Sequence, residues 1–372
     1  PSPTSYPTSC PTSCPTSCPT SRPTSRPTSR PTSSPTLMPT MYLTTVFSVP
    51  GSTYTEIVAG TDKYAVGTYY IASSTNPRAF IFKYADNSYE DLYVPGNEPS
   101  GWKPYSTGTD IVGDTVFFDT AWRVSFSKNM KTGITTSIHP NEYPGYQDAS
   151  ITSVDPTNPQ KRVGHYYTNR ATVVNSFYTD GTKFIQLKSP NPDPDNRGSA
   201  YISYYAKGTH NGKVVGSVGD CCSGRQFPPQ YNIGWFWNGQ IYLEEGIKLP
   251  SSYGTFKYCG ANDIYDDYII GYCESKNFIY KISSKTYHLI TSNIPDAAVS
   301  ISSIIVSPAQ EIILSGSYKL NNDNISMGFR SVLDKNYLIM LSYDNRSANR
   351  VLVEDTPVKT HLRKRDISLK KI

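Results

Sequence analysis

A proline stands at every fourth position from Pro3 to Pro39, and this array limits the fold of the first 40 residues more than any other feature. Each proline removes one backbone donor per helical turn and keeps the preceding residue out of the α region. Neither an α-helix nor a sheet ladder tolerates that spacing. We therefore predict an extended, polyproline II-like arm over residues 1–40, which reaches on the order of 120 Å at ~3.1 Å per residue.

The residues between the prolines are mainly threonine and serine, which is the composition of O-glycosylated stalks. An unmodified flexible linker is the alternative, but a spacer needs composition and not a strict period. The predicted O-glycosylation sites are Thr4, Ser5, Thr8, Ser9, Thr12, Ser13, Thr16, Ser17, Thr20, Ser21, Thr24, Ser25, Thr28, Ser29, Thr32, Ser33, Thr36 and Thr40. The candidate hydroxyproline positions are Pro7, Pro11, Pro15, Pro19, Pro23, Pro27, Pro31 and Pro35.

Arrays of this Pro-Thr-Ser-x type resemble those of secreted and cell-surface proteins of algae and other heterokont protists. They are also similar to the tetrapeptide-repeat subunits of glycan-coated extracellular fibrils, of the glycofibril or mastigoneme kind. The resemblance covers residues 1–40 and implies a structural role outside the cell.

The remainder of the chain repeats at a longer period, and each copy contains three recognisable strands. The first is a short apolar strand at or near glycine: Tyr64–Gly67, Asp114–Phe118 (a degenerate copy), Arg162–Gly164, Lys213–Gly216, Tyr268–Gly271 and Glu311–Gly316. The second is aromatic: Ala79–Phe82, Val124–Phe126, Val174–Phe177, Ile233–Trp237, Phe278–Tyr280 and Met327–Phe329. The third follows a turn: Tyr89–Val94, Gly133–Ile138, Phe184–Leu187, Gln240–Leu243, Tyr287–Ile290 and Tyr337–Met340.

Six copies of roughly 45–55 residues predict an all-β fold, a β-propeller of six blades with about four strands each over residues 41–355. Seven blades, a β-sandwich pair and a β-solenoid are the alternatives. The motif Val49-Pro50-Gly51 matches Val94-Pro95-Gly96 at the end of the first full copy. Residues 41–50 are therefore predicted to be an outermost strand that completes the last blade and closes the ring, which protects the sheet edges.

The copies resemble the extracellular HAF repeat, which pairs an Ile-Val-Gly strand with an Ala-Phe strand. The best match is Asn262–Gly271 followed by Phe278–Tyr280, while the usual His-Ala-Phe triplet is replaced by Arg78-Ala79-Phe80. The resemblance covers about 41–350 and implies a divergent member with a propeller fold.

The seven cysteines indicate an oxidising compartment. Three lie in the arm and have no partners left in the chain, so inter-chain disulfides are predicted, with free thiols as the alternative: Cys10, Cys14 and Cys18. Four lie in the body, where we predict two disulfides across adjacent blades, each member of the vicinal pair taking a separate partner: Cys221, Cys222, Cys259 and Cys273. Zinc is disfavoured because no Cys-x-x-Cys is present. The sequons at Asn324 and Asn345 permit N-glycans.

The net charge of +5 is located at the end of the chain. Residues 359–372 carry six basic side chains and one acidic one, which leaves residues 1–358 at zero. The basic tail, residues 356–372, is predicted to be a solvated end, with a processing site at Lys364-Arg365 and then a patch for a membrane surface or polyanion as the alternatives. No nucleic-acid partner is expected because the basic residues are not spread over the folded body. No apolar run is long enough for a membrane span.

Catalytic and metal-binding signals are weak. The five histidines lack metal-ligand spacing, and Asp193–Asn196 reads as a turn without the bidentate acid of a calcium loop. The pairs Glu244-Glu245 and Asp266-Asp267 point to opposite faces of a strand, and Trp235–Trp237 is more typical of blade packing than of a sugar platform. We expect neither an enzyme nor a cofactor or metal.

The chain begins at Pro1 without a signal segment, so we expect a processed or partial secreted chain. Together these features predict a structural subunit of an extracellular, glycosylated filament or surface appendage. It would polymerise with itself head-to-tail through the arm and the propeller. The alternatives are a carbohydrate-binding or carbohydrate-active propeller on a mucin-like stalk, and an adhesion module that does not polymerise.

Overall fold

The computed structural model divides the chain into two units, Pro1–Leu37 and Met38–Ile372. It describes residues 40–72, 74, 76–94, 105–120, 124–138, 148–167, 174–187, 202–220, 234–243, 246–256, 258–292, 297–307, 309, 311–320 and 325–333. Several predicted features lie outside these residues: the arm before Thr40, the basic tail, both sequons, Cys221, Cys222, Asp193–Asn196, Glu244-Glu245 and Tyr337–Met340.

The described part of the second unit consists of antiparallel sheets that follow one another along the chain. The first strands are β2 (Ser52–Gly60), β6 (Ser106–Val112), β10 (Asp148–Val154), β14 (Ile202–His210), β17 (Cys259–Tyr265) and β21 (Ala297–Val306). The second strands are β3 (Tyr64–Ile71), β7 (Thr115–Thr120), β11 (Arg162–Tyr167), β15 (Lys213–Asp220), β18 (Tyr268–Cys273) and β22 (Ile312–Leu320). The third strands are β4 (Arg78–Lys83), β8 (Ser125–Asn129), β12 (Val174–Thr179), β16 (Gly234–Trp237), β19 (Lys276–Lys281) and β23 (Ser326–Val332). The outer strands are β5 (Ser88–Leu92), β9 (Thr135–Ile138), β13 (Phe184–Leu187), β20 (Thr286–Ser292) and β1 (Thr40–Phe47).

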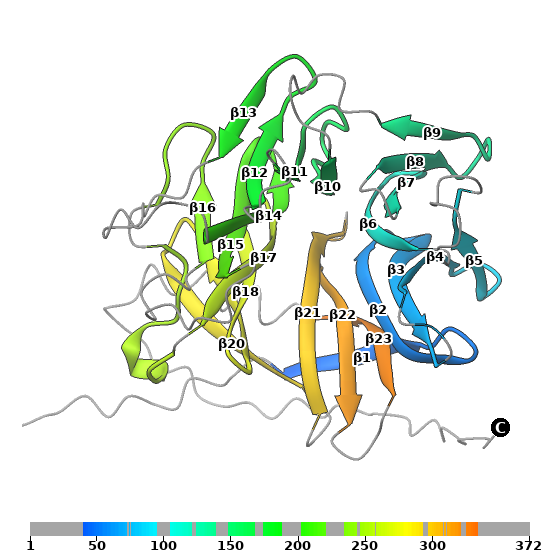
Figure 1. Cartoon of the computed structure of the whole chain (residues 1–372). Coiled ribbons are helices and arrows are strands. Elements are labelled where there is room, and N and C mark those ends of the chain that lie inside the picture. Colours follow the sequence, from blue (N-terminus) through cyan, green and yellow to red (C-terminus); the bar gives the residue numbers. More distant parts are fainter. Residues whose placement is uncertain are drawn as a thin grey trace, which may run out of the picture. The chain divides into compact units, whose positions relative to one another are not determined.

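These sheets are the six blades of a β-propeller. Each first strand contacts the first strands of both neighbouring blades, and β21 returns to β2 to complete the cycle (Figure 1). The fourth blade has three named strands, and its outer position is marked by a bridge between Trp237 and Tyr242. A single short 3₁₀ helix, η3 (Ser251–Tyr253), accompanies the described strands. Within the same residues no helix has the length and apolarity needed to cross a membrane. The predicted propeller and its blade number are confirmed.

The ring is closed by the N-terminal strand, as the sequence predicted. Strand β1 runs antiparallel to β23 along the sixth blade, and its first two residues pair in parallel with the end of β20 in the fifth. The strand covers Thr40–Phe47 rather than 41–50, so the last residue of the predicted arm already belongs to the propeller. At its other end Phe47 is 1% exposed and packs against Phe82 of the first blade, with ring centroids 4.6 Å apart. Strand β1 therefore ties blades five, six and one together.

The recurring glycine has a packing role in each blade that contains it. In the first blade, Gly67 of β3 lies directly across from Phe80 of β4, whose ring covers the glycine. A Cβ at Gly67 would lie 2.8 Å from that ring and 2.0 Å from the carbonyl oxygen of Glu56. The equivalent pairs are Gly164–Phe177, Gly216–Trp235, Gly271–Phe278 and Gly316–Phe329. The glycine lies inside the second strand rather than at its end, where the space of a Cβ is taken by a carbonyl oxygen of the first strand in all five blades and also by the aromatic ring of the third strand in four of them.

The second blade solves the same packing problem differently. Phe118 occupies the glycine position of β7 and pairs with Phe126 of β8, whose ring stacks on it at 5.7 Å. On the first strand Gly108 lies opposite Phe118, and a Cβ at Gly108 would stand 2.6 Å from the carbonyl oxygen of Gly67 in the first blade, so this glycine lets the two blades approach each other. The degenerate copy in the sequence is therefore a complete blade with its small residue on the neighbouring strand.

The prediction of two disulfides across adjacent blades is wrong, because the two cysteines expected to pair with Cys221 and Cys222 are bonded to each other. Cys259 at the start of β17 is bonded to Cys273 at the end of β18, so the link lies inside the fifth blade and not across two blades. The two residues face each other directly in the antiparallel register, and both are buried. Spacing in the sequence could not show this register, which depends on how the hairpin folds.

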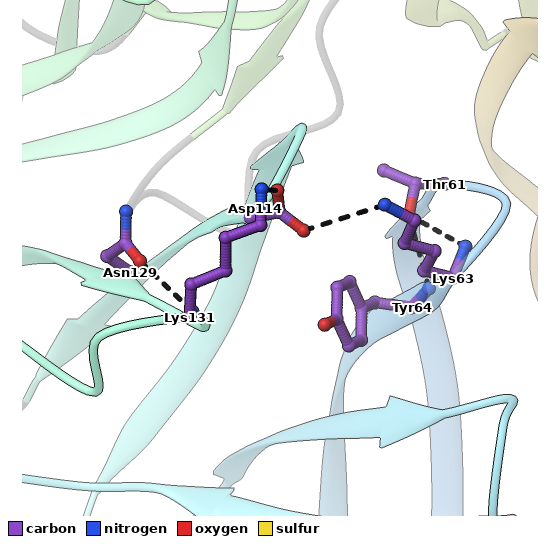
Figure 2. A network of polar contacts seen from close by, with 6 residues as sticks. All are labelled: Thr61, Lys63, Tyr64, Asp114, Asn129 and Lys131. Carbon is purple, nitrogen blue, oxygen red and sulfur yellow. Dashed lines mark hydrogen bonds and ion pairs between the residues drawn. The ribbon is translucent and has the colours of Figure 1, made fainter.

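A polar network at the surface connects the turns of the first two blades. Lys63 in the β2–β3 turn lies 3.9 Å from Asp114 in the β6–β7 turn, and Lys131 lies 2.6 Å from the other oxygen of the same carboxylate (Figure 2). The hydrogen bond from Lys131 lowers the pKa of Asp114. Thr61 and Asn129 accept backbone N–H groups and hold the two lysine-bearing turns. Both lysines are largely exposed, so solvent screens these ion pairs and they contribute little to stability.

Candidate functional site

Each first strand carries a β-bulge at the same level of the ring. At a bulge two residues face one residue of the partner strand, and the extra side chain is re-aimed. The residues skipped in the six registers form a ring of side chains, which we call the bulge ring: Val58, Thr109, Thr152, Lys207, Asn262 and Ser302. The backbone irregularity thus turns one side chain per blade toward the propeller axis.

The bulge ring lines a cavity of about 560 Å³ in the central channel. The cavity extends to Tyr272 and Glu274 at the end of β18 and to Ser300 of β21, so its wall is most extensive at the fifth and sixth blades. Hydroxyl, amide and charged groups dominate the lining. The volume is in the range of small-molecule sites, and the lining is more polar than is usual for them.

Glu56 is the carboxylate of the channel wall with the best defined partners. Tyr54, two residues earlier on the same face of β2, donates to Oε2 at 2.7 Å. Ser302 of the bulge ring donates to Oε1 at 2.6 Å, which also links the first and sixth blades. Burial, followed by the charge of Glu56, raises the pKa of Tyr54. Both oxygens of Glu56 are therefore held in place.

Lys207 supplies the cation of the bulge ring. Its side chain is exposed to the space inside the channel, whose wall is formed by residues of all six blades. Desolvation by the surrounding protein lowers the pKa of Lys207, and the Glu56 carboxylate partly opposes the shift. The ammonium lies 5.9 Å from the ring centre of Tyr205. Among the described residues it makes no hydrogen bond or ion pair, so its donors face the cavity.

An aromatic ring and two amides complete the wall beside Lys207. Tyr272 of β18 lies directly opposite Gly260 of β17, and a Cβ at Gly260 would stand 2.7 Å from its ring. The glycine leaves room for this ring, which is part of the channel wall. The side-chain amides of Asn262 and Asn277 donate hydrogen bonds to the carbonyl oxygens of Ile301 and Val299, at 2.7 and 2.9 Å. Their carbonyl oxygens remain as acceptors.

Next to the bulge ring, two half-buried aspartates that also line the cavity join adjacent blades. Asp110 accepts two hydrogen bonds from the third blade, one from the backbone N–H of Val154 and one from the hydroxyl of Ser153. Asp263 accepts from Ile304 of the sixth blade at 2.9 Å. Burial raises the pKa of Asp110 to about 6 and that of Asp263 to about 8, although the backbone bonds oppose the shift. Burial also raises the pKa of Asp119, which accepts from Ser125, to about 7.

These shifts predict that the propeller loses stability as the pH rises. A carboxyl with a higher pKa in the folded state binds its proton more tightly there, so its contribution is complete below the ordinary value of 3.8 and is lost as pH rises through the folded value. We expect thermal unfolding midpoints to fall between pH 6.5 and 8, where Asp263 ionises, by an amount corresponding to about 2 kcal/mol.

The comparison uses Asp263→Asn, which cannot ionise, and Asp62→Asn in an exposed turn as its control. Because the asparagine loses an acceptor, the readout is the slope of the melting temperature with pH and not its absolute value. The Asp263→Asn slope should be flatter and the control slope unchanged. An unchanged slope in Asp263→Asn would show that this carboxyl is already ionised at pH 6.5.

The structure separates the residues that the sequence singled out. Trp235, Phe236 and Trp237 of β16 are 2%, 7% and 6% exposed, so the core interpretation is confirmed. Asp266 and Asp267 form the tight turn between β17 and β18, and Asp267 binds Ser283. Within the described residues no cluster of three or more histidine, cysteine, aspartate or glutamate side chains could hold a metal ion.

Sequence reasoning missed the channel site entirely, since its members share no residue type. A positional signal exists: in four blades the bulge residue lies nine positions before the central residue of the second strand, as from Val58 to Gly67 and from Lys207 to Gly216. The second and fifth blades have the same spacing, from Thr109 to Phe118 and from Asn262 to Gly271. Longer turns break the spacing in the third and sixth blades.

The fold and the channel define a six-bladed β-propeller with a polar central cavity. No family model matches the chain, and no curated protein matches it. Among solved structures, it is similar to a calcium-binding protein, regucalcin, from Agrobacterium tumefaciens, at 8% identity and a TM-score of 0.42, over 80% of this chain and 97% of that one. It is also similar to an oligogalacturonate lyase in complex with manganese, at 8% identity and a TM-score of 0.38, over 74% and 87%.

A third similar structure is the extracellular domain of a putative one component system from B. thetaiotaomicron, at 12% identity and a TM-score of 0.36. That match covers 73% of this chain and 32% of the other. Similarity at these levels assigns no ligand or activity to this chain. The resemblance to HAF repeats stays a prediction.

Proposed function

We propose that this chain is a structural subunit of an extracellular, glycosylated filament or surface appendage. The propeller is the folded domain of each subunit, and the Pro-Thr-Ser-x arm joins it to the next copy of the chain. The observation that carries this proposal is the junction between the arm and the propeller. The last proline of the array is Pro39, and the closing strand β1 begins at the next residue, Thr40.

This junction suits a connection that bears load. The hydrogen bonds between β1 and β23 run perpendicular to the strand, so a load applied along β1 would be shared by all of them rather than borne one by one. A flexible tether would need only a spacer between the array and the fold, and the sequence has none. The buried Cys259–Cys273 bond fits the oxidising compartment that the proposal requires.

Polymerisation further requires a head-to-tail contact, which gives an open filament when the rotation does not close. The arm cysteines, Cys10, Cys14 and Cys18, would lock neighbouring copies, and glycans on the arm would shield its backbone. The role proposed is structural and not catalytic.

The proposal is tested by secreting three forms from a glycosylating host: the full chain, a deletion of residues 1–37, and the triple variant Cys10→Ser, Cys14→Ser, Cys18→Ser. We expect the full chain to form filaments in electron micrographs and a reducible ladder on gels. The deletion should be monomeric with an unchanged melting temperature, and the triple variant should lose the ladder. A glycosylated full chain that sediments as a monomer at all concentrations would contradict the proposal.

A further inference from the structure

The central channel holds a set of groups that neither the propeller core nor a filament contact uses. Lys207 points its ammonium into the cavity with no bonded partner among the described residues. Asn262 and Asn277 present unused carbonyl oxygens, while their N–H groups are fixed on β21. Thr109 has a hydroxyl without a partner in the described part of the chain. Unmade hydrogen bonds of this kind are costly unless a ligand or water satisfies them.

The shape of the wall adds a second requirement for the ligand. Tyr272 lies over Gly260 and gives the cavity one flat aromatic surface, and the other apolar groups of the wall are small, such as Val58 and Val299. The ligand therefore combines one apolar face with a rim of hydrogen-bonding groups. A pyranose ring has this construction, since its C–H groups form a face and its hydroxyls a rim.

The charges of the wall disfavour an anionic ligand. Glu56, Glu274 and the carboxyl groups of Asp110 and Asp263 face or flank the cavity against a single ammonium. An anionic ligand would be repelled by the carboxylates of Glu56 and Glu274, since like charges at close range are unfavourable. A cationic ligand would meet the ammonium of Lys207, which is one of the six members of the bulge ring. A neutral polyol uses the donors and acceptors without adding charge.

We propose that the channel binds a neutral pyranose sugar, which stacks on Tyr272 and bonds through its hydroxyl groups to Lys207 and the two asparagines. Lys207 donates to hydroxyl oxygens, and the carbonyl oxygens of Asn262 and Asn277 accept hydroxyl protons. Glu56 is a positioning residue, because both its oxygens are already engaged by Tyr54 and Ser302. This site does not depend on polymerisation, so its failure and that of the filament proposal are distinguishable.

The test is calorimetric titration of the full chain with the methyl pyranosides of glucose, galactose, mannose and xylose, and with glucuronate and glucosamine as charged probes. At least one neutral pyranoside should bind with Kd on the order of 1 mM or tighter. Tyr272→Ala should weaken it roughly tenfold, and Lys207→Met about 10- to 100-fold. Tyr272→Phe should keep most of the affinity because it keeps the ring.

Matched controls are Tyr258→Ala and Lys319→Met, which change the same residue types at exposed positions outside the cavity wall. Melting temperatures establish that each variant is folded, and the wild-type chain alone decides whether a sugar binds. Three results would each overturn the proposal: no neutral pyranoside binds at millimolar concentration, only the charged sugars bind, or Tyr272→Ala and Lys207→Met bind as the wild type does.

Discussion

Replacing Phe47 by alanine will destabilise the propeller by about 3–5 kcal/mol, because it leaves a cavity where the closing strand meets the first blade. Phe47 is 1% exposed and contacts the rings of Phe82 and Tyr84, at centroid distances of 4.6 and 5.9 Å. Strand β1 is hydrogen-bonded to the sixth blade, and the aromatic ring of Phe47 is the contact that joins the same strand to the first blade. The effect should appear as a fall of roughly 10 °C in the melting temperature.

The neighbouring residue provides the control for this prediction. Val46 belongs to the same strand but is 46% exposed, so Val46→Ala should change stability by less than about 0.5 kcal/mol. Deletion of residues 1–37 should also be neutral, whereas deletion of residues 1–47 removes β1 and opens the ring. If Phe47→Ala and Val46→Ala melt at the same temperature, β1 does not clamp the ring in the way described.

Gly164→Ala will cost more than about 3 kcal/mol or prevent folding, since overpacking at a backbone contact leaves no side chain that can move aside. A Cβ at Gly164 would stand 1.9 Å from the carbonyl oxygen of Ser150 and 2.8 Å from the ring of Phe177. Urea titration of the secreted chain measures the loss, or its yield shows the failure to fold.

Two variants make this prediction specific. Gly60→Ala places a Cβ no closer than 3.4 Å to any neighbour, so it should be tolerated. The double variant Gly164→Ala, Phe177→Ala relieves the ring contact but not the contact with Ser150, so it should remain at least as unstable as Gly164→Ala. Full recovery in the double variant would show that the ring, and not the first strand, requires the glycine.

The architecture was readable from the sequence because five of the six blades repeat one constraint. A glycine on the second strand and an aromatic residue on the third must face each other, and Gly271 with Phe278 shows this pair at its most regular. The closing strand was readable because Val49-Pro50-Gly51 repeats Val94-Pro95-Gly96. Both features are short patterns of residues, so they can be recognised in the amino-acid sequence alone.

The site and the disulfide depend on register, and register is a property of the folded hairpin. Cys259 and Cys273 face each other because β17 and β18 pair end to end around the turn at Asp266. The bulge ring is equally invisible, because Thr152, Lys207 and Asn262 share a backbone position but no chemistry. The six bulges had to be seen in the structure before their side chains could be considered together.

Mass spectra of the native protein over residues 1–40, recorded with and without reduction, test the filament account most directly. The account predicts hexose or pentose additions on the threonine, serine or proline positions, with inter-chain links through Cys10, Cys14 or Cys18 that disappear on reduction. A bare arm without cross-links would contradict it and leave a propeller on a flexible linker.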